Sequence, residues 1–117
     1  QRARMRFAAL SALGDSDPRA SRGAMSSLIE QPPLPSSPAL SQGLDWLRGQ
    51  DLRGAMHALT ADLMFVHGEQ DRVIDVAAAR TAAEACSAHW LCVPGAAHLP
   101  WLHGGMRELC DWVAADV

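Results

Sequence analysis

The sequence has no long apolar run and no excess of basic residues, and each absence excludes a class of protein. Its apolar stretches are far shorter than the roughly 20 residues that a membrane-spanning helix needs. The formal net charge of −3 gives no basic surface of the kind found on nucleic-acid-binding proteins. We therefore expect neither a membrane nor a nucleic acid as a partner.

Cysteine is scarce, and its spacing offers no cross-link. The three cysteines contain no Cys-x-x-Cys pair, which argues against both a disulfide framework and a thiolate zinc site. Free thiols are typical of a reducing compartment, so a cytoplasmic protein is expected. No metal and no organic cofactor is expected either. The thiols concerned are Cys86, Cys92 and Cys110.

Two further features are missing. The first residue is not methionine, and the cationic start over residues 1–7 is not followed by the apolar segment of a signal peptide. No Gly-x-Ser-x-Gly, a usual setting of a serine nucleophile, occurs in the 117 residues. We therefore expect the chain to be part of a longer protein, whose N-terminal half would hold any such nucleophile.

Residues 1–60 predict helices and loops without strands. The overall composition, 49% hydrophobic and 20% charged, is ordinary for a folded domain. Four prolines within residues 32–38 exclude a helix and a central strand there, and Ser37 or Ser41 is expected to cap the short helix that follows. The expected helices cover about residues 4–13, 18–30, 44–47 and 55–59.

Residues 61–117 predict a β-α-β-α unit. Two short apolar runs with little alternation are typical of parallel strands covered on both faces. Two parallel strands alone leave an open edge, so we expect the remaining strands to lie upstream in the longer protein. The expected elements are strands 63–67 and 90–93 and helices 76–85 and 106–115, with Asp75 capping the first helix and Asp116 outside the last.

One acid and one imidazole follow the two predicted strands. Asp71 and His98 each lie in the loop after a strand, and the carboxyl ends of parallel strands meet at one edge of a sheet. We therefore expect the two side chains to lie side by side. A carboxylate that accepts a hydrogen bond from one ring nitrogen fixes the tautomer, so the other nitrogen can act as a base.

The two loops resemble a pair of known motifs. The segment over residues 65–74, which contains Asp71, resembles the acid motif of the α/β-hydrolase family. The segment over residues 93–103, which contains His98, resembles its histidine motif, in the family's order. Residues 6–10, 32–38 and 43–53 are similar to the lid and lid exit of the pimeloyl-[acyl-carrier protein] methyl ester esterases of biotin synthesis. The resemblance implies the C-terminal part of an α/β-hydrolase fold, incomplete on its own: a helical lid over residues 1–60 and the last β-α-β-α unit of the parallel sheet over 61–117.

The resemblance also implies a role for individual residues of a serine carboxylesterase. Asp71 would be the triad acid and His98 the general base, while a methyl-ester acyl chain on its carrier protein would be the substrate. Without the upstream serine the isolated chain is expected to be inactive. Lid arginines at matching places, Arg2, Arg6 and Arg19, would hold the acidic carrier protein, Phe7 would face the acyl chain, and Arg22 is displaced by one residue from a further expected arginine.

Other functions stay open at this point. The motifs fit equally a general esterase, a thioesterase or a proline-type peptidase of the same fold, because substrate choice lies in the lid. A different possibility is a non-catalytic binding module that docks an acidic partner, and the arginines taken alone fit a solvated helix surface. His67 and His103 are expected to support the structure, and Trp46, Trp90, Trp101 and Trp112 are expected in the core or in a pocket wall.

Overall fold

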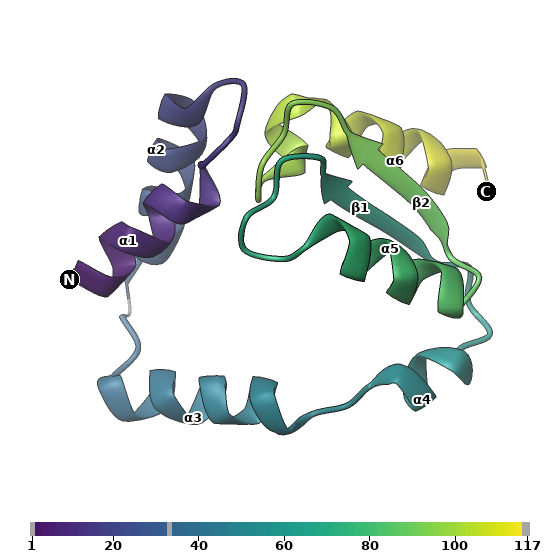
Figure 1. The fold of residues 1–117 in the computed structure, drawn as a ribbon, viewed down its shortest axis with the longest axis horizontal. Helices are drawn as coiled ribbons and strands as arrows, with labels where there is room; N and C mark the ends of the chain where they lie inside the picture. Colours follow the sequence, from purple (N-terminus) through teal and green to yellow (C-terminus); the bar gives the residue numbers. More distant parts are fainter. Residues whose placement is uncertain (1, 33, 116–117) are drawn as a thin grey trace.

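Figure 1 shows a computed structural model of the chain, which describes residues 2–32 and 34–115. Pro33 of the proline-rich stretch and Asp116, predicted outside the last helix, lie outside the described residues. None of the helices in these ranges combines the length and the apolar character needed to cross a bilayer. In chain order the elements are α1 (Arg2–Ser11), α2 (Pro18–Ile29), α3 (Ser37–Gly49), α4 (Arg53–His57), β1 (Met64–Gly68), α5 (Val76–Ala85), β2 (His89–Val93), the 3-10 turn η1 (Pro100–His103) and α6 (Gly105–Ala115).

Strands β1 and β2 form a parallel two-stranded sheet, paired from Met64 with His89 to Gly68 with Val93. Helix α5 connects the strands, and α5 and α6 lie on either side of them (Figure 1). Asp75 caps α5 as predicted, because its carboxylate accepts a hydrogen bond from the backbone N–H of Ala78 at 2.9 Å. The predicted β-α-β-α unit is therefore present, and mixed helices with a small parallel sheet are compatible with part of an α/β fold.

Helices α1 and α2 form a hairpin that packs onto the loop after β2. The turn between them contains Gly14, whose φ of +88° suits glycine, and α2 starts with Asp17 as its cap and Pro18 in its first turn. A core cluster of Ala8, Met25 and Leu99 joins the hairpin to the loop after β2. This cluster fixes the hairpin relative to the sheet.

Helix α3 departs from the prediction in its start and length. Its cap is Ser36, whose Oγ accepts from the N–H of Ala39 at 3.3 Å, so the prediction of Ser37 or Ser41 was wrong. Ser37 and Pro38 form the first turn instead, where a proline's missing N–H has no helical partner to lose. The helix is consequently longer than the short segment expected around residues 44–47.

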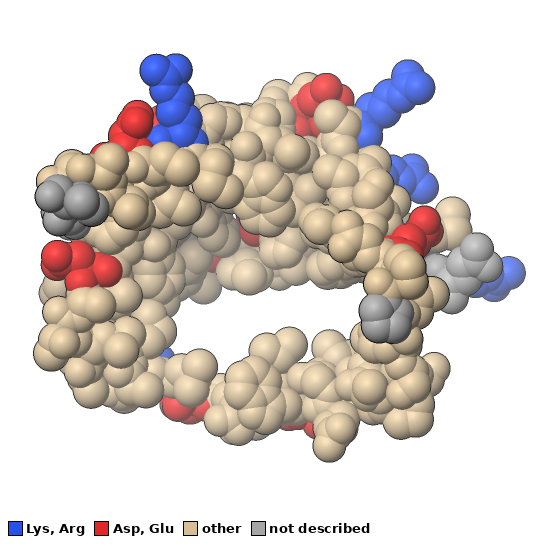
Figure 2. Space-filling view, turned by 180° about the vertical axis from the view of Figure 1, so that it is seen from behind, with Lys and Arg blue, Asp and Glu red and all other residues tan. Residues whose placement is uncertain are grey.

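The surroundings of α3 explain why a second prediction, the burial of Trp46, was wrong. In Figure 2 the molecule has an opening between the segment with α3 and the remainder, and no residue of α3 is buried. Trp46 on this helix is 57% exposed, so the prediction of a place in the core was wrong for this residue. Trp101 is 46% exposed but lines a pocket together with Pro100 and Met106, which is one of the two places predicted for it. Among the described residues nothing packs closely enough on α3 to cover Trp46.

Candidate active site

The loops after β1 and β2 lie against each other. Backbone hydrogen bonds of 3.1 and 2.8 Å join residues 69–70 of the first loop to residues 93–96 around the second. Gly68 stands at the closest approach, where a Cβ would overlap the carbonyl oxygens of both Ala96 and Ala97. Glycine is therefore needed here because the two backbones touch.

Asp71 is a buried carboxylate with three polar neighbours. Its Oδ1 accepts hydrogen bonds from the backbone N–H groups of Val73 at 2.7 Å and Ile74 at 3.1 Å. Its Oδ2 lies 2.8 Å from Nδ1 of His98, and the side chain is only 4% exposed. Burial by itself raises the pKa of Asp71, but the hydrogen bonds from His98 and the two N–H groups outweigh it, so the pKa lies below its usual value. The group is a carboxylate at neutral pH.

His98 is held on both its backbone and its ring. Its backbone N–H donates to the carbonyl of Ser11 at the end of α1, at 3.1 Å. The ring of Phe7 meets the imidazole edge-on, with centroids 6.1 Å apart and planes at 81°. When Nδ1 donates to Asp71, Nε2 carries the free lone pair and can accept a proton. The two side chains predicted to be neighbours are thus joined in the arrangement that general-base chemistry needs.

His67 supports the same carboxylate from the strand side. Its Nε2 lies 3.2 Å from the carbonyl oxygen of Ile74 and 3.6 Å from Oδ2 of Asp71. Its ring stacks on Trp90 of β2, with centroids 5.7 Å apart and planes at 25°. The imidazole therefore ties together the two ends of the turn that carries Asp71, which is the supporting role expected from its position.

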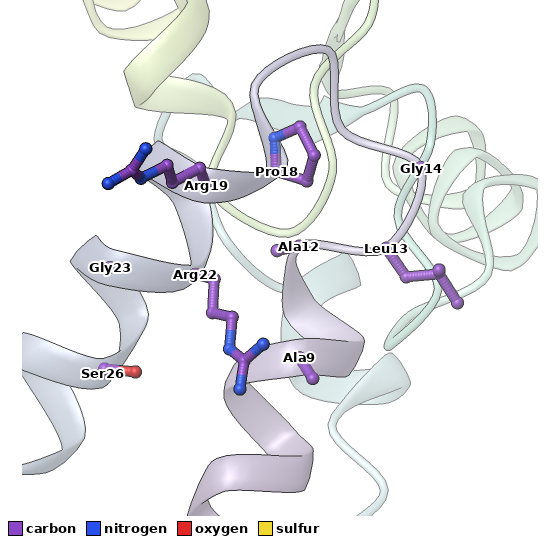
Figure 3. Close-up of a pocket in the computed structure, with 9 residues that line it drawn as sticks. All are labelled: Ala9, Ala12, Leu13, Gly14, Pro18, Arg19, Arg22, Gly23 and Ser26. Atoms are coloured by element: carbon purple, nitrogen blue, oxygen red, sulfur yellow. The ribbon is translucent and has the colours of Figure 1, made fainter.

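The arginines singled out in the sequence lie exposed on the α1–α2 hairpin. Arg2 and Arg6 are one helical turn apart on α1, and Arg19 and Arg22 line an open groove of about 740 Å³ between the two helices. In Figure 3 the Arg22 guanidinium points between the helices, whereas Arg19 points away from it. Within the described ranges, no carboxylate lies at ion-pair distance from any of the four.

Charge is divided unevenly along the chain, which makes this hairpin the basic part of the molecule. Five of the ten arginines occur by residue 22, whereas ten of the thirteen acidic residues follow residue 30. Figure 2 shows basic side chains projecting from the side of the molecule that holds α1 and α2. The hairpin therefore presents an excess of positive charge to an approaching partner.

Phe7 also borders an apolar cleft that sequence patterns did not predict. The cleft has a volume of about 530 Å³ and runs between α1, the end of α2 and the start of α3. The same phenylalanine lies edge-on against the His98 ring, so the cleft and the Asp71–His98 pair share this side chain. Its walls are Ala3, Arg4, Phe7, Leu28, Ile29, Gln31, Pro35, Leu40 and Leu44.

The relatives of the chain are consistent with this geometry. No protein-family model matches the chain. It is 35% identical over 104 residues to the pimeloyl-[acyl-carrier protein] methyl ester esterase of Edwardsiella ictaluri, 34% over 99 residues to that of Xanthomonas oryzae pv. oryzae, and 31% over 100 residues to that of Stenotrophomonas maltophilia. The chain is homologous to part of these esterases. The matches cover 83 to 87% of this chain but only 36 to 40% of each esterase, as the predicted C-terminal part would.

One carboxylate near the Asp71–His98 pair was not singled out in the sequence. Asp15, in the turn between α1 and α2, accepts a hydrogen bond from the N–H of Ala97 at 2.9 Å. The sequence signal was present but ambiguous, because the second aspartate of that turn, Asp17, is sufficient to cap α2.

In residues 2–32 and 34–115, no three His, Cys, Asp or Glu side chains come together in a way that could hold a metal ion.

Proposed function

We propose that the chain is the C-terminal half of an α/β-hydrolase carboxylesterase that acts on a pimeloyl-[acyl-carrier protein] methyl ester. Residues 1–60 would be its lid and residues 61–117 the last part of its core. The observation that carries the proposal is the 2.8 Å contact between Asp71 and His98 in the loops after two neighbouring parallel strands. The names of the homologous proteins support the reaction and the substrate.

In the proposed reaction a serine from outside this chain attacks the ester carbonyl. His98 accepts the serine proton on Nε2 and then gives it to the departing methoxide, which leaves as methanol. The carboxylate of Asp71 orients the ring and stabilises the imidazolium that forms. Water then hydrolyses the acyl-enzyme, with His98 again taking the proton. The chain thus supplies the base and its orienting acid, and the upstream half supplies the nucleophile and the oxyanion donors.

Two surfaces would recognise the substrate under this proposal. The exposed arginines Arg2, Arg6 and Arg19 would attract the acidic carrier protein, because guanidinium groups pair well with carboxylate and phosphate oxygens. The apolar cleft beside Phe7 would take the acyl chain, since burying methylene groups there is favourable. Both surfaces border the hairpin that holds His98, so a bound acyl chain would reach the pair from that side.

The test is a chimeric enzyme. The segment of the Edwardsiella ictaluri esterase that matches this chain is replaced by the chain itself, and hydrolysis of pimeloyl-carrier-protein methyl ester is measured. The chimera should be active, whereas its Asp71→Asn and His98→Gln variants should lose most of the rate at unchanged folding. A folded but inactive chimera, or an active His98→Gln variant, would refute the proposed roles. Hydrolysis by the isolated chain would refute the need for an outside nucleophile.

Substrate class is tested with the same chimera. Replacing Arg6 and Arg19 by alanine should raise the KM for the carrier-protein substrate and leave the hydrolysis of short free esters unchanged. Arg107→Ala, on exposed α6, is the matched control and should change neither. Equal activity of the double variant on both substrates, at wild-type levels, would point to a general esterase instead. Thioesters and proline peptides, offered in parallel, distinguish the other activities of the fold.

A further inference from the structure

The turn between α1 and α2 is docked on the loop that carries His98. The backbone N–H of Ser16 donates to the carbonyl of Gly95 at 2.8 Å, and the N–H of Ala97 donates to Oδ2 of Asp15 at 2.9 Å. The N–H of His98 itself donates to the carbonyl of Ser11 at 3.1 Å. Three polar contacts thus join segments that are far apart in sequence.

Asp15 is the centre of this contact. Its side chain is fully buried, and its Oδ1 accepts a second hydrogen bond from the N–H of Asp17 at 2.8 Å. The same oxygen lies 2.7 Å from Nε2 of His103 at the end of η1, a close contact without the alignment of a hydrogen bond. Burial by itself raises the pKa of Asp15. The hydrogen bonds from Ala97 and Asp17, together with the nearby imidazole, lower this pKa by more than burial raises it, so the pKa lies below its usual value. The buried group is therefore an anion that is well supplied with donors.

The turn itself uses only one oxygen of Asp15, the Oδ1 that accepts from the N–H of Asp17. Asp17 already caps α2, because its Oδ1 accepts from the N–H of Ala20 at 3.0 Å. A buried charge is costly unless hydrogen-bonded partners repay it, and one of the partners of Asp15 is the peptide N–H of the residue directly before His98. The second oxygen, Oδ2, is thus explained by its contact across the fold with Ala97 and not by the turn.

We propose that Asp15 is a positioning residue: by binding the Ala97 N–H it fixes the backbone before His98 and holds the imidazole against Asp71. The contact itself is a property of the chain, and its importance for ester hydrolysis rests on the proposed function. Because Leu99 is fully buried on the other side of His98, the histidine is held at both neighbouring residues.

The test uses the complete chain and compares Asp15→Ala and Asp15→Asn with Asp17→Ala as the matched control. Hydrogen exchange of the Ala97 amide and the low-field Nδ1–H resonance of His98 are measured by NMR. In Asp15→Ala we expect the Ala97 amide to exchange about 10- to 100-fold faster and the His98 resonance to shift upfield or broaden, since a hydrogen bond to a charged acceptor is lost. Asp15→Asn keeps one acceptor oxygen and should be intermediate.

The control separates positioning from general loosening. Asp17→Ala should fray the start of α2 and leave both readouts unchanged, because Asp17 touches the loop of His98 only through Asp15. Unchanged readouts in Asp15→Ala, or equal changes in Asp17→Ala, would overturn the proposal. If Asp15→Ala does not fold, Asp15→Asn decides, and wild-type values in that variant count against the proposal. Neither readout involves an ester, so this result and that of the chimera can fail independently.

Discussion

Gly68→Ala tests whether backbone contact between the two loops assembles the candidate site. The new Cβ would lie 2.6 Å from the carbonyl oxygen of Ala96 and 2.8 Å from the carbonyl carbon of Ala97, whereas ordinary contact begins at 3.4 Å. It would overlap the oxygen of Ala97 still more severely. The obstructing atoms belong to the backbone, so rotating a side chain cannot relieve the overlap.

The size of the effect follows from these distances. To reach ordinary contact with the Ala96 oxygen alone the loops must separate by about 0.8 Å, and the deeper overlap with the Ala97 oxygen requires about twice that separation. If that separation falls between Asp71 and His98, their 2.8 Å contact lengthens to about 4.4 Å, which is no longer a hydrogen bond. Overpacking costs about 1–3 kcal/mol, and we expect about 3 kcal/mol because both loops are already tied by hydrogen bonds.

The assay combines urea unfolding, which gives the free energy of unfolding, with the low-field Nδ1–H resonance of His98. Gly43→Ala on α3 is the matched control, because no atom lies within 4 Å of the place that its new Cβ would take, and it should raise stability by about 0.5–1 kcal/mol. Wild-type stability of Gly68→Ala together with an unchanged His98 resonance would refute the reasoning. Loss of stability without loss of the resonance would mean that the loops separate elsewhere.

Three further predictions concern single side chains. Folding lowers the pKa of Asp71, so its carboxylate contributes stability above about pH 4 that disappears as the pH falls through the lower folded pKa. In Asp71→Asn the free energy of unfolding, measured with urea between about pH 2 and 7, should therefore fall less steeply toward acid pH. An unchanged pH dependence would contradict this. His67→Phe keeps an aromatic ring but leaves the Ile74 carbonyl without its partner, and it should cost about 1–3 kcal/mol in the same assay. Leu99→Ala should cost about 2–5 kcal/mol because the side chain is fully buried, whereas Leu102→Ala, 42% exposed, should cost less than about 1 kcal/mol; similar costs for the two leucines would count against the core described above.

The parts that could be predicted from sequence depend on short-range patterns. An uninterrupted apolar run at residues 63–67 predicts a covered strand, and the aspartate before an alanine-rich segment predicts the start of α5. The parallel pairing then brings the residues after each strand to one edge, so the meeting of Asp71 and His98 followed from topology alone. None of these steps needs knowledge of how distant side chains pack.

The parts that could not be predicted depend on contacts between distant segments. Asp15 and Asp17 look alike in sequence, and only the packing of the hairpin on the sheet shows that one caps a helix while the other binds Ala97. The prediction of the cap of α3 failed for a related reason, because three serines stand close together and a proline in the first turn is compatible with either Ser36 or Ser37 as the cap. The prediction that Trp46 is buried failed because hydrophobicity predicts burial without saying what covers the side chain.

The position of the hairpin suggests how binding of the carrier protein would affect His98, the proposed base. Under the proposed function the carrier protein docks on Arg6 and Arg19, whose helices are joined to the His98 loop by the buried Leu99 and by the Asp15–Ala97 hydrogen bond. A partner that binds the hairpin in this arrangement would therefore also stabilise the Asp15–Ala97 contact beside His98. By contrast, α3 lacks buried contacts and has no comparable connection to the pair within the described residues. Carrier-protein binding should accordingly slow exchange at the Ala97 amide in the chain with its hairpin arginines intact, and this protection should vanish in Asp15→Ala even where binding persists.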